Sequence, residues 1–311
     1  MAAVRGSRRR ASYLSPFGRG GRLGALAAVL FCVMAIGPRP AFSQTPAPLQ
    51  EWQYSAGIVL VRMFEPDLPD WRVQVGLAAE PRPAYEGARN YRTLAGPVID
   101  VRYRDIYFAS VGEGIGVNLV HGENYRAGIA VGYDLGRRES DDLTHLKGLG
   151  NIEVAPVLKV FGSYVVSKDF PLVLRADARR YVGGADGWVG DVEAYLPLPG
   201  SSKKFVMFAG PSVTFADRGH MQTTFGVNDS QALASGYPVY AAHGGMNAVG
   251  FGFTATRIIS SRWLVNANLA VNRLLGSARD SPITHEPPQK ATVTDLALTG
   301  GALALSVVYS W

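Results

Sequence analysis

The last twelve residues place the strongest constraint on the fold, because apolar and small side chains alternate along residues 300–311. A period of two residues is that of a β-strand, and a strand at the end of a chain frays unless a neighbour holds it. In a transmembrane β-barrel the last strand closes the sheet, its apolar face meets lipid, and its aromatic residues lie at the headgroups. We therefore predict that this stretch is the closing strand of a barrel and carries its assembly signal, formed by Leu303, Leu305, Val307, Tyr309 and Trp311.

Residues 1–43 have the three parts of a secretory signal sequence: a basic region, an apolar run over residues 23–37, and a small-x-small cleavage site that ends at Ser43. An uncleaved anchor is the alternative, but the apolar run is shorter than the about 20 residues that a spanning helix needs. The leader contains seven arginines and no acidic residue, so the net charge of +6 comes from the leader and predicts no nucleic-acid partner. We predict cleavage of residues 1–43, a linker over residues 44–50, and a barrel over residues 51–311 in the outer membrane of a Gram-negative bacterium.

The cysteine content excludes several kinds of chemistry. Cys32 is the single cysteine and lies in the predicted leader, so the processed chain has no thiol for a disulfide, a nucleophile or a zinc site. No run after the leader approaches 18 apolar residues, so a membrane-spanning segment has to be a strand of a closed barrel.

Alternating segments follow one another through the rest of the chain. Alternation is also typical of a soluble sandwich, but the leader, the terminal aromatic residues and the charges confined to one strand face favour an all-β, closed antiparallel transmembrane β-barrel. A barrel of ten strands, with 52–63 and one neighbour outside the wall, is the alternative to about twelve strands. The predicted strands are residues 52–63, 71–80, 95–104, 106–119, 125–135, 151–165, 171–181, 187–196, 203–216, 246–257, 262–273 and 301–311.

Charged residues lie on one face of the middle strands, and we predict that this face lines the barrel lumen. On the lipid face an Arg or Lys near the midplane costs about 2–4 kcal/mol. The mixed signs favour a salt-bridge network that fills a narrow lumen over the alternative, a selectivity lining. The predicted lumen-lining residues are Asp100, Arg102, Arg104, Arg126, Lys159, Arg175, Asp177, Arg179, Asp191 and Glu193.

Loop lengths predict the orientation, because bacterial barrels have short periplasmic turns and long outer loops. Near the N-terminus we predict a tight outer turn at Asp105 and a long inner turn at residues 81–94. Counting back from the last strand, the other outer loops are predicted at 136–150, 217–245 and 274–300, and the short inner turns at 120–124, 166–170, 197–202 and 258–261.

Short motifs spread from Trp71 to Trp311 together resemble one protein family. They are Pro83-Ala84-Tyr85-Glu86-Gly87, Asp100-Val101-Arg102-Tyr103, Gly132-Tyr133-Asp134-Leu135-Gly136-Arg137, Leu146-Lys147-Gly148-Leu149-Gly150-Asn151-Ile152, Phe225-Gly226-Val227 and Ser281-Pro282-Ile283. In their order and spacing they resemble the MipA/OmpV family of outer-membrane proteins (proteins like the MltA-interacting protein). The chain departs from the family in its last residue, Trp311, where Phe is usual, and in the additional N-terminal segment 52–63.

The resemblance implies a non-enzymatic outer-membrane barrel that serves as a scaffold for murein-cleaving and murein-synthesising enzymes. The implied partners are a lytic transglycosylase and a bifunctional penicillin-binding protein, besides outer-membrane lipid and the barrel-assembly machinery. Relatives have also been viewed as pores or adhesins. The alternatives are therefore a narrow pore for small solutes and a surface adhesin that acts through residues 217–245 and 274–300.

A periplasmic partner needs a docking surface, and among the predicted inner turns only residues 80–94 form a long segment. We expect murein enzymes to dock there and on the linker after Gln44, so that deletion of residues 84–91 abolishes pull-down of the transglycosylase. The predicted docking residues are Tyr85, Glu86, Arg89, Tyr91 and Arg92.

No catalytic, cofactor-binding or metal-binding residue is assigned, and no enzymatic activity is predicted. Outer-membrane enzymes need a histidine beside Ser, Asp or Glu near the outer rim. The best groups of this kind, His285-Glu286 and Asp141-Asp142 with His145, are interpreted as solvated loop residues. The glycine-rich stretches 112–116 and 183–187 lack the strand–loop–helix context of a phosphate-binding or dinucleotide-binding loop.

Overall fold

The computed structural model describes residues 69–202, 204–284 and 300–310. Contacts divide the chain into two compact units, residues 1–41 and 42–311, and every described residue belongs to the second unit. The predicted leader, the linker and the predicted strand 52–63 lie outside the described residues. Within the described ranges, no helix combines the length and apolar character needed to cross a bilayer.

The described residues form twelve strands with short helices in some of the connections. The first six strands are β1 (Trp71–Pro83), β2 (Tyr91–Tyr103), β3 (Tyr107–Ser110), β4 (Gly114–His121), β5 (Tyr125–Asp134) and β6 (Ala155–Val165). The other six are β7 (Val173–Tyr181), β8 (Gly187–Pro197), β9 (Phe205–Ala216), β10 (Gly245–Ile258), β11 (Trp263–Leu274) and β12 (Gly300–Ser310). The helical segments are η1 (Glu139–Asp141), α3 (Arg218–Phe225), α4 (Asp229–Ser235) and α5 (Gly276–Arg279).

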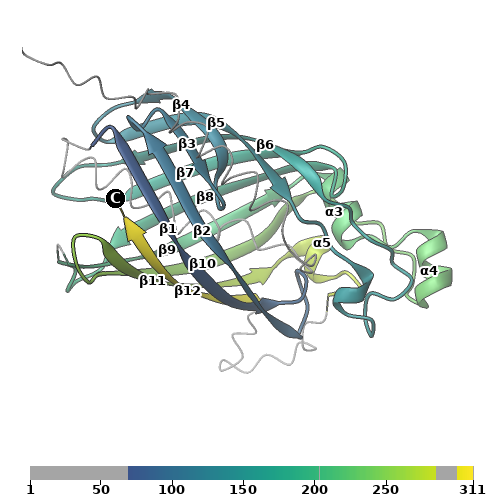
Figure 1. The fold of residues 1–311 in the computed structure, drawn as a ribbon. Coiled ribbons are helices and arrows are strands. Elements are labelled where there is room, and N and C mark those ends of the chain that lie inside the picture. Colours follow the sequence, from purple (N-terminus) through teal and green to yellow (C-terminus); the bar gives the residue numbers. More distant parts are fainter. Residues whose placement is uncertain (1–68, 203, 285–299, 311) are drawn as a thin grey trace, which may run out of the picture. The chain divides into compact units, whose positions relative to one another are not determined.

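Each strand pairs antiparallel with the next, and β1 also pairs with β12, so the sheet closes into a barrel (Figure 1). The register of the closing pair runs from Gln74 opposite Ser310 to Ala79 opposite Leu305. The predicted all-β antiparallel sheet is confirmed. Because β1 takes the place beside β12, the described strands close the wall without residues 52–63.

The predicted single strand over residues 106–119 is wrong, because the structure has a short hairpin there. β3 and β4 are separated by a turn at residues 111–113, and Gly114 follows with a φ of 85°. Glycine adopts this left-handed conformation without the steric cost of a side chain. A Cβ at Gly114 would also lie 2.4 Å from the carbonyl oxygen of Val131, so the hairpin needs glycine for its close approach to β5 as well.

This unrecognised turn also explains why two predicted loop placements are wrong. The turn at Asp105 lies at the end of the barrel that carries the short turns, and the loop 84–90 lies at the end that carries the long loops (Figure 1). Both placements are the opposite of the prediction. The hairpin adds one reversal of the chain, so every strand and loop before it lies at the opposite end of the barrel from the predicted one. After the hairpin the strand pairing agrees with the predicted alternation: the long loops that follow β5, β9 and β11 share one end.

Burial alternates along the strands, with apolar side chains on the outside of the barrel and charged side chains on the inside. On β7, Arg175, Asp177 and Arg179 are buried, whereas Ala176 and Ala178 between them are exposed, as is Leu174 before them at 42%. A closed sheet with this alternation has a polar lumen and an apolar outer belt. The belt includes Leu77, Ile115, Leu119, Ile129, Val131, Leu158, Val160, Val192, Phe251 and Leu269, all of which are exposed.

Aromatic side chains bound this apolar belt at both ends. Along β5, the exposed Tyr125 and Tyr133 mark the two limits, about 26 Å apart along an extended strand. Because barrel strands are tilted by about 35–45°, this length spans about 20 Å across the bilayer, slightly less than the about 25 Å of an outer-membrane apolar band. Ring pairs at the short-turn end are Trp71 with Tyr103, at a centroid distance of 4.7 Å, and Trp263 with Tyr309, at 5.1 Å.

The long loops pack against one another and form what we call the cap, which comprises residues 84–90, 135–154, 217–244 and 275–284. Its apolar core includes Tyr85, Leu146, Leu149, Val227 and Ile283. A second cluster joins the cap to the barrel, because Met221 and Phe225 of α3 pack with Tyr181, Ala248 and Leu274 at the strand ends.

The sequence explains why short helices form within the cap. Asp217 caps α3, since its side chain accepts a hydrogen bond from the His220 amide. Asn228 and Gln231 form a capping box at the start of α4. These helices lie at the end of the barrel away from the last residues of β12 (Figure 1).

Candidate functional site

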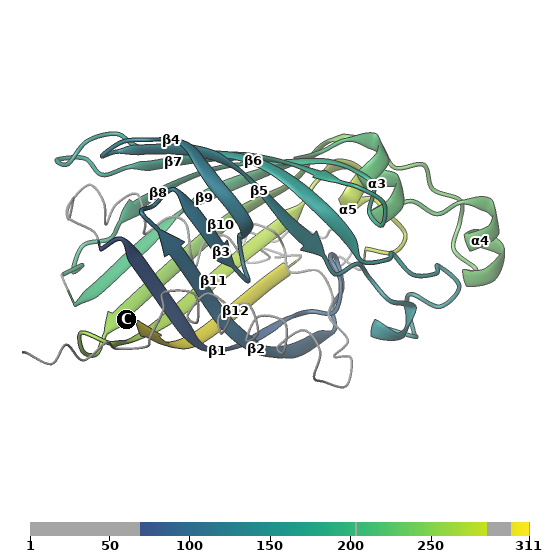
Figure 2. The same cartoon turned by 45° about the horizontal axis from the view of Figure 1, so that its top comes forward.

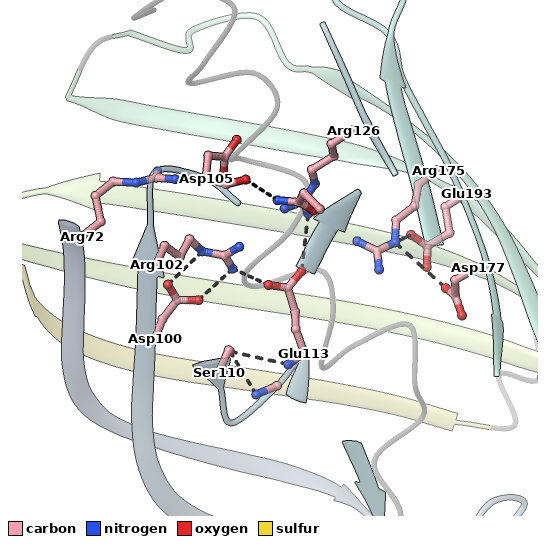
Figure 3. A network of polar contacts seen from close by, with 12 residues as sticks. Arg72, Asp100, Arg102, Asp105, Ser110, Glu113, Arg126, Arg175, Asp177 and Glu193 are labelled. Atoms are coloured by element: carbon pink, nitrogen blue, oxygen red, sulfur yellow. Dashed lines mark hydrogen bonds and ion pairs between the residues drawn. The ribbon is translucent and has the colours of Figure 1, made fainter. Parts of the chain in front are cut away.

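The lumen contains a first cluster of buried charges on β2, β5 and the β3–β4 turn (Figure 3). The Arg102 guanidinium donates to both carboxylate oxygens of Asp100, at 2.9 and 2.8 Å, and also to Glu113. Arg126 Nη2 lies 3.4 Å from Glu113 Oε1. Glu113 therefore joins two guanidinium groups that come from different strands.

Two local features of the sequence position this first cluster. Asp100 and Arg102 are two residues apart on β2, so strand geometry places both side chains on the inner face. Glu113 is placed by the turn instead, in which the Ser110 hydroxyl accepts hydrogen bonds from the amides of Gly112 and Glu113 at 3.2 and 3.5 Å.

A second cluster lies on β7 and β8. The register sets Arg175 opposite Glu193, and the two side chains lie 3.8 Å apart. The register also sets Asp177 opposite Asp191, a pairing of like charges that is unfavourable by itself. Arg179 compensates for it, because its guanidinium lies 3.2 Å from Asp177 and also contacts Asp191.

Aromatic rings lie beside the guanidinium groups of the first cluster. Arg102 lies 5.4 Å from the centroid of Phe108, and Arg126 lies 5.6 Å from that of Phe161. The two rings pack edge-on at 5.8 Å, and Lys159 Nζ lies 5.5 Å from the Phe161 ring. Cation–π contacts of this kind strengthen when water is excluded. The interior is thus filled by charged and aromatic side chains that contact one another.

Of the ten predicted lumen-lining residues, the structure buries nine inside the barrel, and Arg104 is the exception. The prediction for Arg104 is wrong because β2 ends at Tyr103, and Arg104 follows in the turn with a φ of 52°. Its side chain is exposed and lies 3.1 Å from Asp70 at the short-turn end. Alternation along a strand has no predictive value beyond the residue at which the strand ends.

Sequence reasoning missed several buried charges. Glu113 was read as part of a glycine-rich strand, although a carboxylate between two glycines is a turn signal that would have located it. Asp105 is also buried and lies 3.2 Å from Arg72 of β1. Arg82, near the end of β1, is fully buried.

The predicted docking residues lie at the cap end of the barrel, so their predicted place in an inner turn is wrong. Tyr85 is buried in the cap, where its hydroxyl donates to the Ile283 carbonyl oxygen at 3.2 Å. Arg92 lies 2.9 Å from Asp141 of η1. Arg89 and Tyr91 are exposed at this same end. None of these side chains faces the short-turn end.

Glu86, the remaining predicted docking residue, interacts with the lumen charges. Burial raises the pKa of its carboxyl to about 7, and the negative charge of Asp191 raises it further, whereas Arg179 lowers it. Both of these residues belong to the second cluster, on β7 and β8. The loop 84–90 is therefore coupled electrostatically to the interior.

Two histidines of the described residues form local hydrogen bonds through their rings. His145 Nδ1 lies 2.7 Å from Asp142, whose carboxylate also accepts a hydrogen bond from the Thr144 amide. His220 Nδ1 lies 2.9 Å from the Ala185 carbonyl oxygen, and burial lowers the pKa of this imidazole to about 4. Within the described ranges no three His, Cys, Asp or Glu side chains form a metal-ligating group. His285-Glu286 lies outside them.

The predicted assembly signal lies mostly where only the backbone is described. Tyr309 is opposite Val75 in the closing pair, and Val75 is exposed on the outer face. The register places Leu305 and Val307 opposite Ala79 and Leu77 and Leu303 opposite Leu269, whereas Trp311 lies outside the described residues.

A closed antiparallel barrel with an apolar belt, aromatic residues at both limits and a charged interior defines an outer-membrane β-barrel protein. The family described as "MltA-interacting protein MipA" matches residues 75–299. The chain belongs to this family, and the resemblance seen in its sequence motifs is confirmed.

Other comparisons gave more distant similarities. No curated protein matches the chain. Among solved structures, it is similar to the "CymD monoaromatic hydrocarbon channel", with 8% identity, 84% of this chain and 92% of that chain covered, and a TM-score of 0.40. It is similar to the translocator domain of the autotransporter NalP from Neisseria meningitidis, with 14% identity, 85% and 96% covered, and a TM-score of 0.36. For the NanC porin the identity is 12%, the coverage 77% and 98%, and the TM-score 0.34.

Proposed function

We propose that this chain is a non-enzymatic outer-membrane scaffold that holds a murein-cleaving enzyme, and through it a murein-synthesising enzyme, at the periplasmic surface. The observation that carries the proposal is the filled lumen. Arg102, Arg126, Arg175 and Glu193 are each at most 3% exposed. The first two pair with Glu113, and Arg175 pairs with Glu193. A barrel filled in this way provides a rigid anchor and no wide aqueous path. The family description, which names an MltA-interacting protein, supports a lytic transglycosylase as the partner.

The docking surface has to be revised from the predicted loop 84–90, because that loop lies at the cap end. In bacterial barrels the short turns and the chain termini face the periplasm. Among the apolar side chains exposed in the described turns at this end, the most exposed are Phe170, in the connection 166–172, at 52%, and Ile259, in the turn 259–262, at 63%. We therefore place the docking surface on these turns.

A pull-down from detergent-solubilised envelopes tests this surface. The double variant Phe170→Ser/Ile259→Ser is expected to lose capture of the lytic transglycosylase while its barrel still assembles. Leu233→Ser is the matched control, because Leu233 is 90% exposed on α4 at the opposite end. Equal capture by both variants would contradict the docking surface, and loss of capture in the control alone would place the transglycosylase contact on the cap instead.

The narrow pore is the second candidate, and planar bilayers separate it from the scaffold. Purified wild-type protein is expected to give no steady single-channel openings, because the ion-paired side chains occupy the interior. Regular openings of uniform size would contradict the sealed scaffold and establish a pore.

We also propose that residues 1–43 are removed during export. Sequencing of the N-terminus of the envelope protein is expected to start at Gln44. A mature protein that retains the apolar run 23–37 would show that the leader serves as an anchor instead.

A further inference from the structure

The wall of the barrel is incomplete beside the short β3–β4 hairpin. β3 pairs with β2 only from Asp100 to Tyr103, and β4 pairs with β5 only as far as Val131. Among the described residues, residues 91–98 of β2 and 132–134 of β5 therefore have no strand neighbour on the sides that face each other. Figure 2 shows β3 as a short arrow beside the much longer β2 and β5.

Contacts from the cap close this gap from above, which makes it a window rather than an open slot. Arg92 of β2 lies 2.9 Å from Asp141 of η1, and the Asn90 side chain donates to Asp142 at 3.0 Å. The region bounded by the turn 111–113, residues 91–98, residues 132–134 and these cap contacts is called the window below.

The window contains open space on its inner side. A Cβ added at Gly96 of β2 or at Gly132 of β5 would meet no atom within 4 Å. In the continuous wall just below, a Cβ at Gly116 or Gly128 would lie 2.4 or 2.1 Å from its nearest neighbour. The two rims of the window thus have free volume that the adjoining wall lacks.

The window lies at the depth of the apolar belt, in the half nearest the cap. Its outer rim carries the exposed Ala95 and Pro97 on one side and Val131 and Tyr133 on the other. Tyr133 belongs to the aromatic boundary of the belt, so lipid surrounds the opening from outside.

A molecule bound in the window has to match both the polar strand edges and the surrounding lipid. A backbone N–H or C=O group without a hydrogen-bond partner costs several kcal/mol in hydrocarbon. Open strand edges therefore occur at membrane depth only where protein, water or another polar group contacts them. The outside of the same opening borders lipid chains. A molecule that satisfies both has a polar head for the strand edges and an apolar tail that remains in the bilayer.

We infer that the window between β2 and β5 is a lateral binding site for the polar headgroup of an amphiphilic lipid from the cap-side leaflet. The headgroup pairs with the exposed edges of residues 91–98 and 132–133 and fills the volume beside Gly96 and Gly132. The tail extends outward past Pro97 and Val131. This site is independent of the proposed docking of murein enzymes at the opposite end.

Site-specific fluorescence quenching tests the inference in the full-length protein. In a Cys32→Ser background, Gly96→Cys and Gly132→Cys report from the two rims, each labelled with bimane and reconstituted in phosphatidylcholine vesicles. Gly190→Cys is the reference for bulk lipid, because Gly190 lies on the outer face of β8 in the continuous wall, next to the buried Asp191, and a Cβ there makes only an ordinary contact at 3.4 Å. The quenchers are phosphatidylcholine with a nitroxide on its headgroup and, separately, aqueous iodide.

At both rims we expect quenching that saturates at a low mole fraction of the headgroup-labelled lipid and is several-fold stronger than at position 190. Quenching by iodide alone would show that the window holds only water. Protection from both quenchers would show that protein fills it, for example residues 52–63. Equal, unsaturated lipid quenching at all three positions would show that no site exists. Each of these three results would overturn the inference, and two rim positions keep it testable if one variant fails to assemble.

Discussion

At the scale of single residues, the interior depends on carboxylates that each serve more than one guanidinium. Asp100 and Arg102 were predictable, because a period of two residues assigns them to one strand face. Glu113, which connects Arg102 to Arg126, was not predictable in the same way, since its position depends on a turn rather than on alternation. Sequence periodicity identifies the residues of a face but not the partners that a turn brings to it.

Removal of the Glu113 charge tests the importance of this connection. Glu113→Gln leaves two buried guanidinium groups without the anionic partner they share, and breaking a buried pair costs about 3–5 kcal/mol. We expect the unfolding temperature in detergent to fall markedly. Arg104→Gln is the control: its ion pair with Asp70 is exposed to solvent, so its unfolding temperature should remain that of the wild type. Equal stability of the two variants would show that the lumen network does not hold the barrel together.

At the scale of structural elements, the β3–β4 hairpin determines much of the molecule. It places Glu113 inside the lumen, ends the wall early and sets the direction of β1 and β2. Alternation predicts one strand over residues 106–119, since both halves alternate and the turn between them is only three residues long. Because the hairpin is missing from the predicted strands, the loop 84–90 is predicted at the wrong end of the barrel.

Substitution of Gly114 measures how strongly the hairpin depends on this residue. Gly114→Ala combines a left-handed φ, which costs about 1–2 kcal/mol for a residue with a side chain, with a contact of 2.4 Å to the Val131 carbonyl oxygen. Gly183→Ala is matched to it, because Gly183 has a φ of 79° and no atom within 4 Å of the added Cβ. We expect chemical denaturation to show a clearly larger loss for Gly114→Ala. Equal losses would mean that backbone strain, and not the approach to β5, explains the glycine.

The cap loop 84–90 is expected to respond to pH through Glu86. Burial raises the pKa of Glu86 from 4.5 to about 7, with a further rise from Asp191 that Arg179 opposes. The docked loop therefore binds the proton more tightly than a loop released into water. Its stabilisation is fully present below about pH 4.5, and it is lost as the pH rises through about 7.

Hydrogen exchange of residues 84–90, corrected for the intrinsic rate at each pH, measures this effect. Protection is expected to be greater at pH 5 than at pH 8 in the wild type and independent of pH in Glu86→Gln. A pH dependence that persists in Glu86→Gln would assign the effect to another group.

A second cap residue is expected to act with the opposite sign. Burial lowers the pKa of His220 to about 4, although its hydrogen bond to the Ala185 carbonyl oxygen raises it, as does Asp217, while Arg179 lowers it. The neutral imidazole is thus preferred in the folded cap, and the stabilisation is lost as the pH falls from 6.5 towards 4. Proteolysis of the cap is expected to accelerate below pH 5 in the wild type. His220→Gln should remove this acid sensitivity, and an unchanged acid profile in that variant would contradict the assignment.

At the scale of the whole molecule, the strands form a closed barrel with an apolar outer belt and charged side chains inside. The alternation of residues along the strands predicted the all-β antiparallel sheet and the face on which charges lie. It could not predict the cap, because the packing of Tyr85 on Ile283 joins loops almost two hundred residues apart. Long-range contacts of this kind have no local signal in the sequence.

The electrophoretic shift of the envelope protein on heating distinguishes a closed membrane barrel from a soluble fold. A closed barrel resists unfolding by detergent at room temperature, so the unheated protein is expected to migrate faster than the boiled protein and to need detergent for its extraction. A processed chain that is soluble without detergent and migrates identically before and after boiling would contradict the account.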